Sequence, residues 1–79
     1  MPTILTVGPY RFFFYSADGG EPPHVHVEPE RSSAKFWLNP VVLVRSHGFA
    51  RAELLDIQRI VAENEPRFRR AWDDYFGNR

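Results

Sequence analysis

The sequence predicts an α+β domain, in which an antiparallel sheet of four to five strands over residues 3–45 is covered on one face by two C-terminal helices. Up to residue 45, short β-branched or aromatic segments alternate with turns that contain glycine and proline. After Gly48 the apolar residues recur with a helical period instead. The chain has 79 residues and no cysteine, so we expect one domain over residues 1–79 whose core depends on apolar contacts alone.

The predicted strands are separated by recognisable turn signals. The strands comprise residues 3–7, 10–16, 24–28, 34–39 and 41–44. Residues 17–20 hold Asp-Gly and Gly-Gly pairs, which favour a tight reversal, and the prolines of residues 21–23 require extended backbone. Pro40 has no N–H for a strand ladder, so it marks a break or bulge before the last strand.

The first predicted helix, over residues 50–63, has an apolar stripe on one side. The stripe consists of Leu54, Ile57, Ile60 and Val61. Phe49 and Leu54 have the spacing of a hydrophobic staple around an N-cap at Ala50, and Glu53 stands at the capping-box position. Ala50 itself has no side-chain acceptor. The cap is therefore incomplete.

The second predicted helix, over residues 65–76, has a broader apolar face. This face consists of Phe68, Ala71, Trp72, Tyr75 and Phe76. Asn64 is suited to cap this helix, Pro66 is tolerated in its first turn, and Gly77 ends it. The two amphipathic helices supply the cover that the sheet needs.

Alternation along the strands divides the sheet side chains into two faces. The face towards the helices is apolar, and we expect a common core of Phe12, Phe14, Phe36, Leu54, Ile57, Phe68 and Trp72. The opposite face mixes aromatic, cationic and titratable side chains: Arg11, Phe13, Tyr15, His24, His26, Glu28, Lys35 and Trp37. We expect this second face to be open and to be the working surface, since a merely solvated face has little use for both Phe13 and Trp37.

His24 and His26 are the candidate catalytic residues. Side chains at i and i+2 of a strand project the same way about 6.6–7 Å apart, which lets both reach one substrate or ion. Acid–base chemistry, metal ligation with Glu28, and a structural or partner-binding role are the alternatives. Two histidines make an incomplete metal site, so no metal and no cofactor are predicted. We expect both rings to act on a partner or substrate, the alternative being that residues 21–23 hold His24 in a structural turn.

The charge pattern excludes several classes of function. The formal net charge is zero, and no block of like charge indicates a nucleic-acid tail or a membrane-binding helix. The N-terminus has no signal-peptide pattern, and no apolar run approaches the length of a membrane span. A cytoplasmic location without membrane association is the expectation.

One resemblance spans most of the chain and rests on residues 10–16 (YRFFFYS), 21–27 (EPPHVHV), 34–38 (AKFWL), 48–49, 53–54, 71–72 and 75–77. Together these segments resemble a small bacterial family, the domain of unknown function numbered 4160. Ala50 departs from it, because the family more often has serine there. The resemblance implies no established activity and no catalytic residue. It does imply a gene pair with a second small protein, in an arrangement similar to a toxin–antitoxin system.

The expected function is therefore that of one component of a toxin–antitoxin-like module, which binds the product of an adjacent gene through the second face or a strand edge. The alternative is a small metal-independent ribonuclease or a single-stranded RNA-binding module, with His24 and His26 as acid and base and with Arg11 or Lys35 binding phosphate. The sequence leaves open whether the chain is an enzyme and whether it forms a homo-oligomer. Zero net charge weakens the RNA alternatives, because phosphate affinity is mostly electrostatic.

Overall fold

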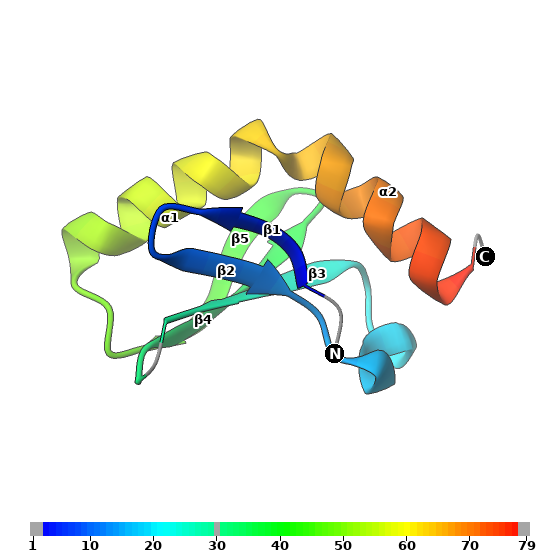
Figure 1. The fold of residues 1–79 in the computed structure, drawn as a ribbon, viewed down its shortest axis with the longest axis horizontal. Helices are drawn as coiled ribbons and strands as arrows, with labels where there is room; N and C mark the ends of the chain where they lie inside the picture. Colours follow the sequence, from blue (N-terminus) through cyan, green and yellow to red (C-terminus); the bar gives the residue numbers. More distant parts are fainter. Residues whose placement is uncertain (1–2, 30, 78–79) are drawn as a thin grey trace.

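The structure, a computed structural model, describes residues 3–29 and 31–77 and confirms the predicted α+β fold. Five strands form one antiparallel sheet whose spatial order, β1-β2-β3-β4-β5, follows the order of the chain. The strands are β1 (Thr3–Val7), β2 (Tyr10–Phe13), β3 (His24–Glu28), β4 (Ser33–Leu38) and β5 (Val41–His47). The helices α1 (Arg51–Glu63) and α2 (Glu65–Phe76) follow and lie on one face of this sheet (Figure 1).

The segment after β2 differs from the prediction. β2 ends at Phe13 instead of residue 16, and residues 16–20 form a 3-10 helix, η1 (Ser16–Gly20), instead of a tight reversal. Phe14 leaves the ladder because its ring packs among aromatic rings of α2, with centroids 5.4 Å from Trp72 and 5.3 Å from Phe76. The Asp18 carboxylate accepts a hydrogen bond from the Tyr15 N–H at 2.8 Å and so holds the start of η1.

Pro40, where the sequence predicted a break or bulge, lies in a two-residue turn between β4 and β5, and Leu38 pairs with Val41 across this turn. Asn39 and Pro40 form the connecting turn, and the peptide bond between them is cis. A register shift between Lys35 and Phe36 places one extra residue in β5, which runs to His47 and is longer than expected.

The core lies between the sheet and the helices. Cross-strand pairs bring Phe12 opposite Val27 and Phe36 opposite Val25, and all four side chains are fully buried. The helices contribute the buried residues Ile57, Val61, Phe68 and Trp72. Of the seven predicted core residues only Leu54 is half-buried instead of buried. The strand alternation therefore assigned the core face correctly.

The two helices begin without side-chain caps. Ala50 is the N-cap of α1 in extended conformation, and only the Glu53 carboxylate closes the turn, accepting from the Ala50 N–H at 3.4 Å. Asn64 occupies the N-cap position of α2, but its amide donates to the Ile60 carbonyl at 2.9 Å. The prediction that the Asn64 side chain caps α2 is therefore wrong, since this amide closes the end of α1 instead.

Replacing Ala50 with serine should stabilise the protein by about 0.5–2 kcal/mol, because a hydroxyl at an N-cap accepts from an N–H that α1 leaves without a partner. Chemical denaturation of both proteins measures the difference. Ala62→Ser, at an exposed position inside the same helix, is the control and should be slightly destabilising. An unchanged midpoint for Ala50→Ser would mean that the first turn gains nothing from an acceptor.

Replacing Gly48 with alanine should destabilise the protein by about 1–3 kcal/mol, because its φ of +86° is costly for a residue with a Cβ. A Cβ there would also lie 2.6 Å from Ser32 Oγ and 3.1 Å from Ser32 Cα. Gly20→Ala is the matched control, since its Cβ would meet nothing within 4 Å. Equal denaturation midpoints for the two variants would contradict the expectation.

Candidate functional site on the second sheet face

The eight residues predicted for the second face lie together on or beside the sheet side that faces away from the core. Cross-strand pairs join Arg11 to Glu28, Phe13 to His26, His26 to Lys35, and His24 to Trp37. Tyr15 lies beyond the end of β2, and its ring packs against His26 with centroids 4.8 Å apart. The structure therefore brings the predicted site residues into one connected surface.

The expectation that this face is open is wrong at one end. The side chains of Phe13, His24 and Lys35 are almost fully buried, with 2%, 0% and 6% of their surface exposed. At this end the chain turns back after β2 into η1, which lies below the sheet while α1 and α2 lie above it (Figure 1). Trp72 at the C-terminal end of α2 also packs against the His24 ring, with centroids 4.9 Å apart. Tyr15 stays 45% exposed beside the covered end.

Asp18 of η1 joins the two histidines, and the sequence analysis did not single it out. One of its carboxylate oxygens, Oδ2, lies 3.0 Å from His26 Nε2 and 3.1 Å from His24 Nε2. The same oxygen accepts from the Tyr15 N–H, which fixes the carboxylate. The Asp-Gly signal of residues 17–20 indicated a turn, and nothing in its local pattern linked Asp18 to the histidines.

His24 is held from all sides. Its Nδ1 donates to the carbonyl of Pro22 at 2.9 Å. Its ring packs between Trp37 of β4 and Trp72 of α2, with centroids 5.7 and 4.9 Å away. Its Nε2 is buried and makes no hydrogen bond to any group in residues 3–29 and 31–77, because the approach to Asp18 at 3.1 Å lacks hydrogen-bonding angles. The structural alternative for His24, with residues 21–23 holding its ring, fits these contacts.

The electrostatics of this cluster favour a neutral His26 and an ionised Asp18. Burial lowers the pKa of the His26 ring below its ordinary value, although the nearby Asp18 carboxylate acts in the opposite direction. Burial alone would raise the pKa of Asp18, but the Tyr15 N–H and the two histidines outweigh it and lower that pKa. A carboxylate is therefore kept charged between two imidazole rings.

The two predicted cationic residues already have partners on the same face. Arg11 pairs with Glu28, and its guanidinium lies 4.3 Å from the centre of the Phe13 ring. Lys35 pairs with Glu21, lowering the pKa of that carboxyl, and its ammonium lies 4.9 Å from the Trp37 ring. Both charges are thus compensated within the chain and are poorly placed to attract phosphate.

Two hollows border the site. A groove of about 200 Å³ runs past Tyr15, His26 and Lys35 to Arg45 and His47 of β5. His47, the last residue of β5, is exposed there and is not part of the Asp18 cluster.

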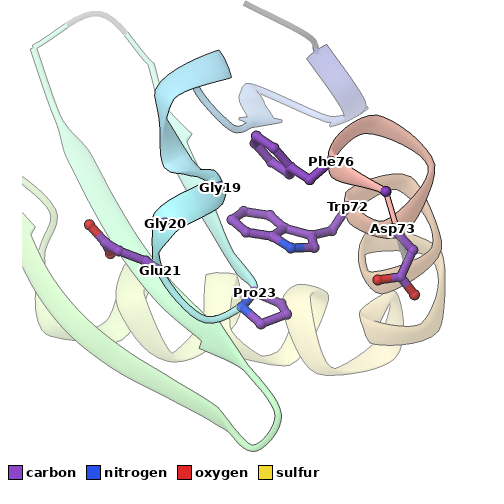
Figure 2. Close-up of a pocket in the computed structure, with 8 residues that line it drawn as sticks. Gly19, Gly20, Glu21, Pro23, Trp72, Asp73 and Phe76 are labelled. Atoms are coloured by element: carbon purple, nitrogen blue, oxygen red, sulfur yellow. The ribbon is translucent and has the colours of Figure 1, made fainter. Parts of the chain in front are cut away.

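A second hollow, of about 390 Å³, separates η1 from α2. Figure 2 shows the rings of Trp72 and Phe76 projecting from α2 towards the backbone of Gly19 and Gly20, with the Glu21 side chain pointing away. A Cβ on Gly19 would lie 2.8 Å from Phe76 Cδ1, so the glycine permits this close approach.

Apolar surface remains exposed along the outer strand β5. Val42 and Val44 are 45% and 37% exposed. Val42 pairs with Trp37, whose ring borders a hollow of about 250 Å³ that Pro22, Pro23 and the Asn39–Pro40 turn complete. We call Trp37, Val42 and Val44 the β5 patch. The sequence analysis did not predict this patch, because it assigned only Trp37 of the three residues to the second face.

The family comparison agrees with the resemblance seen in the sequence. Residues 10–73 match the family described as Domain of unknown function (DUF4160), and the chain belongs to this family. The match includes β2 to β5, both histidines, Asp18 and most of the two helices. We found no similar protein among curated sequences or among solved structures. In residues 3–29 and 31–77, no helix combines the length and the apolar character needed to cross a membrane.

Replacing His24 with alanine should destabilise the protein by about 2–5 kcal/mol, because it removes a fully buried ring and leaves a cavity. The Pro22 carbonyl also loses its side-chain donor. His26→Ala should destabilise the protein less, since 13% of the His26 side-chain surface is exposed. His47 is exposed, so His47→Ala should change the stability by no more than about 0.5 kcal/mol. Denaturant titration ranks the three variants. A His24→Ala protein as stable as His47→Ala would contradict a structural role for His24.

Proposed function

We propose that this protein is one component of a bacterial two-gene module of the toxin–antitoxin kind. In this proposal the protein uses β5 to bind the small protein that the adjacent gene encodes. Family membership supports the proposal through the gene pairing that the resemblance implies. The partner contributes a β-strand that pairs with the outer side of β5, and its side chains cover the β5 patch.

The observation that carries this proposal is the exposed outer strand. β5 is an edge strand of seven residues in an open sheet, and it carries two exposed valines. An edge strand presents backbone N–H and C=O groups to any added strand, and natural proteins usually protect long apolar edges from such pairing. A partner that adds a strand satisfies these groups and buries the valines together with Trp37.

The ribonuclease and RNA-binding alternatives have less support. His24 has no exposed surface, so the two histidines cannot both reach a substrate in this conformation. Phe13 is buried and cannot stack on a base, which leaves Tyr15 and Trp37 as exposed or half-exposed rings. Arg11 and Lys35, the expected phosphate ligands, are paired with carboxylates.

The test measures binding of the purified chain to the purified product of the adjacent gene. Val42→Glu and Val44→Glu each place a charge in the β5 patch and should weaken binding at least about 10-fold, as expected for truncated or charged interface positions. Leu55→Glu is the matched control, because Leu55 is 60% exposed on α1, outside β5. Circular dichroism shows whether each variant is folded.

Equal binding by all of these variants would refute β5 as the interface, and no binding by the unaltered chain would refute the partner. If instead the unaltered chain is a dimer and Val42→Glu makes it a monomer, a second copy occupies β5. Growth after expression of each gene alone and of both together then tests the toxin–antitoxin assignment, which predicts inhibition by one product and rescue by the pair.

A further inference from the structure

A cluster of nitrogen and oxygen ligand atoms lies at the covered end of the second face, where the His24 ring contacts Trp37 of the β5 patch. His24 Nε2, His26 Nε2 and a carboxylate oxygen of Asp18 all lie within 4.8 Å of one another. Two of them come from one strand and the third from η1. His26 Nε2 makes a hydrogen bond to this carboxylate oxygen at 3.0 Å, so the feature to be explained is the second nitrogen, that of His24, at the same oxygen.

The hydrogen bonds of His24 make this arrangement unfavourable without a cation. The Pro22 carbonyl can only accept, so His24 Nδ1 donates to it. The buried His24 Nε2 lies 3.1 Å from the Asp18 carboxylate without hydrogen-bonding geometry, and it has no hydrogen-bond partner in residues 3–29 and 31–77. Leaving a buried polar atom without a partner is unfavourable. A metal ion bound to His24 Nε2 would supply the missing partner.

We infer that Asp18, His24 and His26 form a binding site for one divalent transition-metal ion, for which Zn²⁺ is the expected occupant. Two imidazoles and one carboxylate are a common ligand set for such ions, and three protein ligands leave one position for water or another molecule. Mg²⁺ and Ca²⁺ prefer oxygen ligands, and the chain has no cysteine to favour a softer ion.

The distances fit this ion. With Zn–N and Zn–O bonds of about 2.0–2.1 Å, neighbouring ligand atoms of a tetrahedral site lie about 3.3 Å apart. The Asp18 oxygen lies 3.0 and 3.1 Å from the two nitrogens, close to this spacing, and all three ligand atoms lie within 4.8 Å of one another. Asp18 and His26 keep 14% and 13% of their side-chain surface exposed, so the site meets solvent on one side.

Outer contacts hold each ligand in place, as in established metal sites. The Pro22 carbonyl orients the His24 ring, and the Tyr15 N–H binds the Asp18 carboxylate. His26 is stacked against Phe13, with ring centroids 5.5 Å apart. The bound ion would tie η1 to β3. The sequence predicted no metal because the third ligand becomes adjacent only after η1 folds onto the sheet.

The test uses the full chain without a histidine tag, stripped of metal with a chelator and titrated with Zn²⁺ by calorimetry. We expect one equivalent to bind and to raise the melting temperature. Co²⁺ should give the visible absorption bands of a four- or five-coordinate site and should be displaced by Zn²⁺. Asp18→Asn and His26→Gln should each weaken Zn²⁺ binding at least about 10-fold, since losing even an outer contact of a metal ligand costs about 10–100-fold.

His47→Gln is the matched control and should bind Zn²⁺ like the unaltered chain, because His47 lies outside the cluster. Circular dichroism and melting without metal establish that the two ligand variants are folded before they are titrated. Absence of one-to-one binding by the unaltered chain would overturn the inference. So would unchanged affinity in both ligand variants, or loss of binding in His47→Gln.

Discussion

Burial of the His24 ring is the constraint on which the second sheet face and the segments around it depend. The ring lies where β3 begins, and it contacts Trp37 of the second face and Trp72 of the helical layer. It also anchors the Pro22 carbonyl and faces Asp18 of η1. In a 79-residue chain without disulfides, one polar ring thus connects the sheet, the preceding loop and a helix. The position of η1 and the closed end of the second face are parts of this same packing.

The second face is consequently divided into two parts with different chemistry. The end near η1 is closed, and its residues are bound to one another through aromatic packing and paired charges. The side along β5 is open and apolar, and its backbone edge has room for another strand. Metal binding at the closed end and partner binding at the open side are therefore separate proposals, and either one can fail without affecting the other.

Compensation of charge within the face also limits what it can recognise. Arg11 and Lys35 each have a carboxylate partner and an aromatic ring beneath them, so the face has no free cationic cluster among its predicted binding residues. The proposed partner would therefore be held by backbone pairing and apolar contact more than by electrostatic attraction. This property suits a protein partner better than a polyanion, whose affinity rests mainly on phosphate contacts.

The sequence by itself determined the class of fold, the helices and the division of the sheet into faces. These features are local: a period of two or of 3.6 residues decides which way each side chain points, so Phe12 and Phe36 were assigned to the core and His24 and Lys35 to the other face. Only the tertiary structure decided that Phe14 leaves β2 for the rings of α2, and that η1 brings Asp18 to the two histidines. The reason is that burial depends on which distant segment covers a residue, and a repeating local pattern carries no information about that cover.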